Sequence, residues 1–567
     1  MKGKWHEIVS MLRAWSRRSK FDKEAPLIVE RLLKRLLDER AAGNSEAKAT
    51  TELYNTLLDS WACAAIFGTQ SPAVASQRAR EILVSLQETF EREADPDLRP
   101  DSESFYLVFQ AVCRTEGPLI SRRLLAWMEY LHKVGKNESA KPSRRQYISL
   151  LDAYANSKGE NAGLLTEGFI RHMNATGIVP DTYCYNIAIK AWSRAKRGRE
   201  AAEHADRILD EMEAPKDLVT YSSVIAAWAA SGMRSHAVAR AEELLQDIEN
   251  TPGLEANTIV MNSVMSTWVK SRNPAAVNRT AEILEIMEQS SNCRPDLFSY
   301  NTHLHALSMH AQRTGYARRA SKLVEELQRR SAAGESHLRP NLFSYNLAID
   351  AWSKANEYDA AWNAVKILRN MIDGQGPQPD NFSFNQVLCA LARSSRPGAA
   401  QLAERLFQYM IQAHRLKLQK NARPDVVGCT SVIVALARSG EADGAERAEA
   451  LLSQLKMAYA AGEHHLKPTR AVYNALIDCW AKSGRGTYAA RRSEALLQEM
   501  EDSGDSAVSP DIVTYNAVLN AWAKSGTRCC ANKAEEYLER MWELYDEGRG
   551  CIAPNDKSFN TVSSFDR

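Results

Sequence analysis

One segment recurs along this 567-residue sequence and decides what the chain can fold into. Its clearest copy spans Pro510–Gly526, and a similar copy spans Tyr473–Gly484. With the residue that follows the aromatic as its marker, the segment is found at positions 55, 106, 148, 186, 222, 262, 301, 346, 385, 430, 474, 516 and 560. The intervals run from 36 to 51 residues, and self-similarity at such a period is typical of arrays of small supersecondary units.

Each copy has the pattern of an amphipathic helix. In the clearest copy, apolar side chains stand at Tyr515, Val518, Leu519 and Trp522, which is the spacing of one helix face. A second amphipathic stretch follows in each unit, for example Ala445–Leu455. A hairpin of two such helices cannot bury both apolar stripes alone, so it must stack on its neighbours. The sequence therefore predicts an all-α fold, an α-solenoid of helix-turn-helix repeats.

The repeats divide the chain into three stretches. Residues 1–50 are predicted to be a degenerate first repeat or a leader, residues 51–554 an array of about 12 hairpins, and residues 555–567 the start of a truncated repeat. Some units carry extra residues after the second helix, such as 331–338 and 458–466, which we interpret as extra helical turns or loops. No apolar run reaches the roughly 20 residues needed to span a bilayer, so no membrane partner is expected.

Seven tryptophans share one place, seven residues after the aromatic of the copy. They could stack on nucleic-acid bases, but their period puts them on the buried face, and leucine replaces them at Leu307, Leu391 and Leu436. We therefore favour a packing role. These tryptophans are Trp61, Trp192, Trp228, Trp268, Trp352, Trp480 and Trp522.

The residue directly after the aromatic is asparagine in nine of the thirteen copies. Asparagine is a mediocre helix former, so its repeated choice indicates a shared hydrogen-bonding task, and an amide offers both the donor and the acceptor that a base edge requires. We call these residues the repeat asparagines. They are Asn55, Asn186, Asn262, Asn301, Asn346, Asn385, Asn474, Asn516 and Asn560.

Two further polar positions recur. An Asp or Asn recurs at the junction before the first helix of a unit, mostly after a proline, where a helix N-cap alone would explain it. We call these residues the junction caps. They are Asp181, Asp217, Asn257, Asp296, Asn341, Asp380, Asp425, Asp511 and Asn555.

Nine residues after the aromatic, a basic residue recurs. Two explanations fit this recurrence. Cations are generally preferred at helix C-termini, and a row of cations along one face, a ladder, would neutralise the phosphates of a nucleic acid. Such a ladder would let a chain with 72 Lys and Arg against 70 Asp and Glu hold a polyanion. These helix-end cations are Arg194, Lys270, Lys354, Arg393, Arg438, Lys482 and Lys524.

No pattern of catalysis or metal binding stands out. The ten cysteines form no CxxC pair, and the sequence has no HExxH helix, glycine-rich phosphate loop or paired-carboxylate signature. We therefore expect no catalytic residue, no metal, no cofactor and no small-molecule substrate. The cysteines read as small buried apolar residues.

The units resemble pentatricopeptide repeats, whose pattern Pro-Asp-x-x-Thr-Tyr-Asn is matched at Pro510–Asn516. The resemblance covers the chain from about residue 50 to its end, and Ile8–Leu37 resembles one more degenerate unit. It implies a right-handed superhelix that binds single-stranded RNA, one nucleotide per repeat. The base is read by the residue after the aromatic together with the last residue of the same unit. An apolar side chain two residues before the aromatic wedges between bases.

Carried over by position, the resemblance assigns a base to most repeats. Asn with Asp resembles the uridine-reading pair, at Asn55/Asp101, Asn186/Asp217, Asn262/Asp296, Asn346/Asp380, Asn385/Asp425 and Asn474/Asp511. The pairs Asn301/Asn341 and Asn516/Asn555 resemble pyrimidine readers, and Ser222/Asn257 resembles an adenosine reader. Base choice stays open at Tyr106/Ser143, Ile148/Asp181 and Thr430/Thr469. The wedge residues would be Val219, Ile259, Phe298, Phe343, Phe382, Val427 and Val513.

Three functions therefore compete. The first is sequence-selective binding of a mainly U-rich or pyrimidine-rich single-stranded RNA, in RNA processing, stability or translation, alongside other RNA-processing proteins. The second is a protein-interaction scaffold without RNA binding, and the third is a nuclease-associated member of the family. Residues 1–20 hold six Lys or Arg and one acidic residue, Glu7, which resembles a mitochondrial presequence. We expect an organellar location, the mitochondrion before the plastid.

Overall fold

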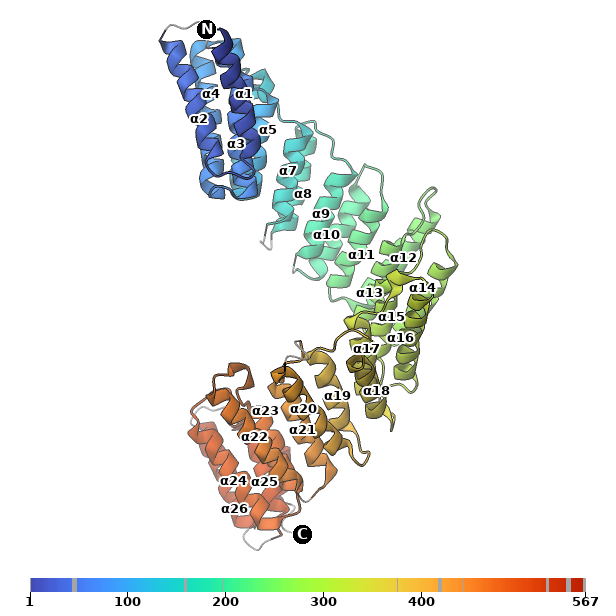
Figure 1. The fold of residues 1–567 in the computed structure, drawn as a ribbon. Helices are drawn as coiled ribbons and strands as arrows, with labels where there is room; N and C mark the ends of the chain where they lie inside the picture. The colour runs from blue at the N-terminus through green and yellow to red at the C-terminus, as the bar shows by residue number, and fades with distance from the viewer. Residues whose placement is uncertain are drawn as a thin grey trace. The chain divides into compact units, whose positions relative to one another are not determined.

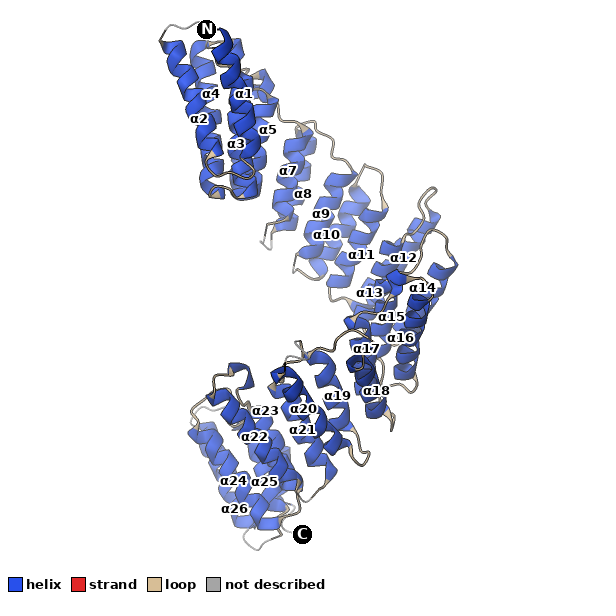
Figure 2. Ribbon diagram, in the orientation of Figure 1, coloured by secondary structure: helices blue, strands red, loops and turns tan. Residues whose placement is uncertain are grey.

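The computed structural model describes residues 2–42, 48–157, 161–195, 197–374, 376–416, 421–441, 443–526, 530–546 and 552–563. Over these residues the chain forms α-helices and short 3-10 helices and has no strand (Figures 1 and 2). The chain divides into two compact units, Met1–Ser271 and Arg272–Arg567. Within the described part of the chain, no helix is both long and apolar enough to cross a bilayer.

Unit 1 is a stack of helical hairpins. The helices with odd numbers correspond to the first helix of each predicted unit and pack side by side in one row, while each even-numbered helix packs against the odd-numbered helices beside it. Its elements are α1 (Lys2–Arg18), α2 (Ala25–Ala41), α3 (Thr51–Phe67), α4 (Pro72–Glu93), η1 (Pro96–Leu98), α5 (Ser102–Thr115), α6 (Pro118–Lys133), η2 (Glu138–Ala140), α7 (Arg144–Ala155), α8 (Ala162–Ala175), α9 (Thr182–Arg194), α10 (Arg199–Glu211), α11 (Leu218–Ala230), α12 (Arg234–Asn250) and α13 (Thr258–Ser271).

Unit 2 repeats the same arrangement, again with the odd-numbered helices in one row. Its elements are α14 (Ala276–Gln289), α15 (Leu297–Met309), α16 (Tyr316–Ala332), η3 (Ser336–Leu338), α17 (Leu342–Lys354), α18 (Ala360–Ile372), α19 (Asn381–Arg393), α20 (Ala399–Arg415), α21 (Val426–Ser439), α22 (Gly444–Ala460), η4 (His464–Leu466), α23 (Arg470–Lys482), α24 (Gly486–Asp502), α25 (Ile512–Ala523), α26 (Cys530–Asp546) and α27 (Asp556–Ser563). The predicted all-α solenoid of helical hairpins is confirmed.

The two ends of the array follow the same plan as its middle. Helices α1 and α2, in the stretch read as a degenerate repeat or a leader, form a hairpin that packs against α3. At the other end, α27 packs against α25 and α26, and residues 564–567 lie outside the described residues.

The extra residues within the longer repeats extend the second helix and then form a short 3-10 helix after it. Helices α16 and α22 each run for 17 residues, whereas α10 has 13. A 3-10 turn follows each long helix, η3 after α16 and η4 after α22. The additions are therefore both extra helical turn and loop.

The predicted core position of the tryptophans is confirmed. Six of the seven are buried, and Trp268 is half-buried. Leu307, Leu391 and Leu436, which replace tryptophan in other units, are also buried. Burial of such large side chains supplies much of the hydrophobic stabilisation between hairpins.

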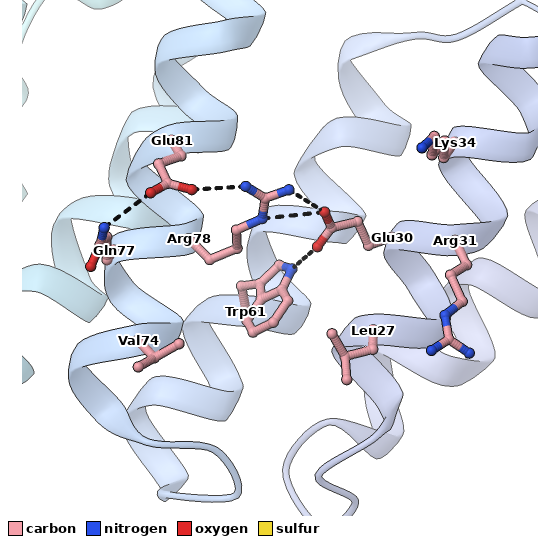
Figure 3. Close-up of a pocket in the computed structure, with 9 residues that line it drawn as sticks. All are labelled: Leu27, Glu30, Arg31, Lys34, Trp61, Val74, Gln77, Arg78 and Glu81. Carbon is pink, nitrogen blue, oxygen red and sulfur yellow. Dashed lines mark hydrogen bonds and ion pairs between the residues drawn. The ribbon is translucent and has the colours of Figure 1, made fainter.

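Most of the tryptophan indoles also bind a side chain of a neighbouring second helix. In α3, Trp61 Nε1 donates to Glu30 Oε2 at 3.1 Å, and Glu30 accepts from Arg78 Nη2 at 2.5 Å, as Figure 3 shows. Arg78 also pairs with Glu81 at 2.8 Å. The same indole, carboxylate and arginine combination holds Trp228 with Asp206 and Arg240, and Trp480 with Glu449 and Arg492. Adjacent hairpins are thus joined by directed contacts as well as by apolar packing.

Candidate nucleic-acid interface

The repeat asparagines and junction caps lie at the start of the odd-numbered helices. Where such a cap is present, the helix begins where the cap side chain takes up an unsatisfied backbone N–H of the first turn. Asp101, Asp181, Asp217, Asp296 and Asp380 each accept from the backbone N–H three residues later, at 2.8 to 3.0 Å. Asn257, Asn341, Asp425, Asp511 and Asn555 do the same, at 2.9 to 3.2 Å. The N-cap interpretation of this position is confirmed.

The structure also brings repeat asparagines together with junction caps, and with Asp101, which caps α5 in the same way, across adjacent hairpins. Asn55 Nδ2 donates to Asp101 at 3.0 Å, Asn186 to Asp217 at 3.1 Å and Asn346 to Asp380 at 3.2 Å. The same contact joins Asn385 to Asp425 at 2.9 Å, Asn474 to Asp511 at 3.4 Å and Asn516 to Asn555 at 3.3 Å. The two positions predicted to act as one pair are therefore hydrogen-bonded in six of the predicted pairs.

A third residue completes this arrangement, and sequence analysis missed its role. Six repeat asparagines accept through Oδ1 from a hydroxyl at the third residue of the next odd-numbered helix, at 2.6 to 2.7 Å. These third-residue hydroxyls belong to Ser104, Thr220, Ser344, Ser383, Thr514 and Ser558, and all six residues are fully buried. The sequence does hold a pattern that indicates this position, because a Ser or Thr stands directly before the aromatic in most copies.

These hydrogen bonds hold the carboxylates of two junction caps, Asp217 and Asp511, in the ionised form. Burial opposes ionisation of Asp217, but the backbone N–H and hydroxyl of Thr220 and the amide of Asn186 outweigh it and keep the pKa below its usual value. Asp511 behaves alike, with burial opposed by Thr514, Asn474 and the nearby Arg470, and its pKa is lowered too. Each such pair presents a negatively charged acceptor next to an amide donor.

The remaining predicted positions do not all form this pair. Ser222 and Thr430 turn their hydroxyls back to the carbonyls of Val219 and Val426, at 3.1 and 2.7 Å. Asn262 lies in unit 1 and Asp296 in unit 2, so their pairing stays a prediction. The base assignments of all the pairs also stay predictions.

The predicted wedge residues are exposed to solvent. All seven are exposed, with fractions between 48% and 63%, although they are large apolar side chains on helices most of whose other apolar residues are buried. Sequence analysis missed an eighth, Tyr183, which stands at the same offset before Tyr185 and is 55% exposed. Burying apolar surface is favourable, so a repeated exposed row of this kind indicates a ligand surface.

The helix-end cations fall into three groups. Lys354 and Lys482 are paired with the aspartates one turn earlier, at 2.5 and 2.6 Å. Arg393 and Arg438 donate to main-chain carbonyls at the end of the preceding odd-numbered helix, at 3.1 and 3.3 Å, and Arg194 donates to Asn156 at 3.2 Å. Lys270 and Lys524 are exposed. Over the described residues, only the first group is paired with a carboxylate. Phosphate binding therefore stays a prediction for the other five helix-end cations.

Comparison with known families agrees with these observations. Residues 418–483, which include α21, α22 and α23, match the model of the pentatricopeptide repeat domain. The capped, aromatic-centred hairpin of this segment recurs throughout both units. This segment belongs to the pentatricopeptide repeat family. The predicted family is thereby confirmed for these residues.

Solved structures of a pentatricopeptide repeat protein are similar to this one. The maize protein PPR10 is 20% identical, with a TM-score of 0.41, and the match covers 98% of this chain and 80% of that chain. A structure of PPR10 in complex with an 18-nt psaJ RNA element is 19% identical, with a TM-score of 0.40, and covers 99% and 84% of the two chains. Among curated proteins, none matches the sequence.

Proposed function

We propose that this chain binds single-stranded RNA along its odd-numbered helices, with a preference for uridine and other pyrimidines. We further propose that it acts in organellar RNA processing, stability or translation. The observation that carries the RNA-binding proposal is the hydrogen bond from a repeat asparagine to a junction cap beside an exposed apolar or aromatic residue two positions before the aromatic. This combination recurs at Asn186, Asn346, Asn385 and Asn516. A stacking surface and a hydrogen-bonding pair in each unit are what single-stranded RNA recognition needs.

The chemistry of the pair explains the uridine preference. One hydrogen of the asparagine Nδ2 goes to the cap carboxylate, and the amide has a second. The pair can therefore offer an N–H donor beside a carboxylate acceptor. Uracil carries the complementary set, a carbonyl oxygen beside a ring N–H, whereas cytosine carries an amino donor beside a ring acceptor. A cap asparagine in place of aspartate removes the charged acceptor, which agrees with a broader pyrimidine choice at Asn516/Asn555.

The test compares binding of the full chain to short oligo-U and oligo-A at several salt concentrations. We expect tighter binding of oligo-U, with log K falling against log salt at a slope of about −3.5. This follows from about −0.7 for each of the five helix-end cations that are not paired with a carboxylate. Equal affinities for the two oligonucleotides would overturn base selection, and no binding to either would leave the scaffold function.

A pair of variants separates the wedge role from general surface effects. Replacing the exposed Phe343 with alanine is expected to weaken oligo-U binding by about tenfold, because base stacking on an aromatic is worth about 1–3 kcal/mol. Replacing Ile286, an exposed apolar residue of the even-numbered helix α14, is the matched control and should leave binding unchanged. Equal effects of the two changes would contradict the wedge assignment.

A further inference from the structure

The third-residue hydroxyl closes a ring of hydrogen bonds around the repeat asparagine. At the junction of α17 and α19, the backbone N–H of Asp380 donates to Ser383 Oγ at 3.2 Å, and Ser383 Oγ lies 2.6 Å from Asn346 Oδ1. Asn346 Nδ2 donates to Asp380 Oδ1 at 3.2 Å, and Asp380 Oδ1 accepts from the backbone N–H of Ser383 at 2.9 Å. Ser383 Oγ also lies 2.8 Å from Asp380 Oδ1. Three side chains from two hairpins are thus interlocked.

The ring fixes which way the amide faces. Ser383 Oγ accepts from the backbone N–H of Asp380, and its single hydrogen is shared between Asn346 Oδ1 at 2.6 Å and Asp380 Oδ1 at 2.8 Å. Rotating the amide by half a turn would place Oδ1 against the Asp380 carboxylate, and Ser383 Oγ, which already accepts from a backbone N–H, would then have to accept from Nδ2 as well. The hydroxyl therefore favours the orientation in which the amide nitrogen, with its second hydrogen, lies beside the carboxylate.

One junction lacks this hydroxyl and differs in its contacts. Between α19 and α21, the third residue is Gly428, and a Cβ there would lie 2.8 Å from Asn385 Oδ1, so the asparagine fills the space of the missing side chain. Over the described residues, Asn385 Oδ1 is buried without a hydrogen-bond partner. Asp425 Oδ2 accepts from Asn385 at 2.9 Å and also from Asn381 at 2.6 Å. Here the amide is less firmly oriented and the carboxylate acceptor is already occupied.

We propose that the third-residue hydroxyl determines base specificity, as a positioning residue that holds the repeat asparagine in its uracil-reading orientation, and that Gly428 relaxes selection at Asn385/Asp425. The inference rests on the proposed RNA-binding function and deepens it. It adds a third position to the two that select the base. It also predicts that two pairs of the same composition, Asn346/Asp380 and Asn385/Asp425, discriminate differently.

The experiment uses the full chain and an oligo-U series in which a single cytosine is moved through every position. In the wild type, we expect the cytosine to weaken binding by about tenfold opposite Asn346/Asp380 and by about twofold opposite Asn385/Asp425, since tenfold corresponds to 1.4 kcal/mol. Replacing Ser383 with alanine should reduce the effect at the first position to about twofold, without change at the other positions. Replacing Ser383 with threonine should retain it, because Thr220 and Thr514 fill the same place in other junctions.

Matched variants guard against a general loss of structure. Ser493, a fully buried serine of α24 whose hydroxyl has no partner over the described residues, is replaced with alanine as the control, and its cytosine profile should equal that of the wild type. Replacing Gly428 with serine should displace Asn385 and raise discrimination at its position. Thermal unfolding of each variant shows that it is folded.

The outcomes separate the two proposals. If the wild type binds no oligo-U, or binds every member of the series equally, the proposed function itself fails. If the wild type discriminates by position but the Ser383 to alanine change leaves its profile unaltered, the hydroxyl has only a structural role and the inference is overturned. Equal loss in the alanine and threonine variants would also overturn it.

Discussion

At the scale of single residues, His303 in α15 is a buried ionisable group with a measurable consequence. Its side chain is 7% exposed, and its Nδ1 lies 2.8 Å from Thr280 Oγ1. Burial, with a smaller contribution from the positive charge of Arg319, lowers the pKa of His303 to about 4. The unfolded chain therefore binds a proton at this residue between about pH 6.5 and pH 4 that the folded chain does not bind.

This histidine should make unit 2 less stable in mild acid. Because the folded pKa is below the unfolded one, the free energy of unfolding falls as the pH drops from about 6.5 towards 4, by about 2 kcal/mol between pH 7 and pH 5. Replacing His303 with glutamine should remove most of that difference in denaturant unfolding at the two pH values. Replacing the exposed His236 is the control, and an unchanged pH difference in the His303 variant would contradict the assignment.

The repeat asparagines show which side-chain contacts could be predicted from the sequence and which could not. Their recurrence indicated a shared hydrogen-bonding task, and the structure gives each paired asparagine one, as in Asn474 with Asp511 and Thr514. The partner hydroxyl was not predicted, because a Ser or Thr at the third residue of a helix reads as an ordinary capping-box residue. Only the packing of adjacent hairpins shows that this hydroxyl also reaches the asparagine of the preceding unit.

At the scale of the helix pair, Trp192 of α9 illustrates how closely the helices pack. The indole is fully buried and stacks on His204 of α10, with ring centroids 4.1 Å apart. The indole also meets the start of α8, where a Cβ on Gly163 would lie 2.3 Å from Trp192 Cδ2. The contact between α8 and α9 therefore depends on the missing side chain of this glycine.

Two glycines of α8 should then respond in opposite ways to alanine. Replacing Gly163 is expected to destabilise the hairpin by about 1–3 kcal/mol, because the added methyl overpacks against the indole. Replacing Gly168, where a Cβ meets nothing within 4 Å, should be neutral or stabilising by up to about 1 kcal/mol, since alanine is the better helix former. Denaturant unfolding measures both, and equal changes would contradict the packing argument.

The sequence predicted the helices but not this kind of contact. The aromatic stripe and the seven-residue offset to tryptophan placed both helices and their buried faces correctly, because helical periodicity follows from local pattern. Close approach of Gly163 to Trp192 is a contact between residues of adjacent units, and no local pattern encodes it. The same holds for the carboxylate of Glu30, which binds an indole from one helix and an arginine from another.

At the scale of the whole molecule, each hairpin is stabilised by its neighbours. A destabilising substitution in one hairpin should therefore lower the stability of the adjacent hairpins only. In unit 2, α23 packs against α21, α22, α24 and α25. Its residue Leu476 is fully buried, and replacing it with alanine is expected to cost about 2–5 kcal/mol through lost apolar burial and the cavity left behind.

The distribution of that loss distinguishes a solenoid from a single cooperative core. Stability in a repeat array is close to a sum of unit and nearest-neighbour contributions, so hydrogen-exchange protection should fall in α21 to α25 of the Leu476 variant and stay unchanged in α15 to α17 of the same unit. An exposed change on the same hairpin, Arg491 to alanine, is the control and should alter protection little. Uniform loss of protection over all the helices of unit 2 would mean that the unit unfolds as one body. The assumption that each pair of hairpins positions its own asparagine, cap and hydroxyl independently would then fail as well.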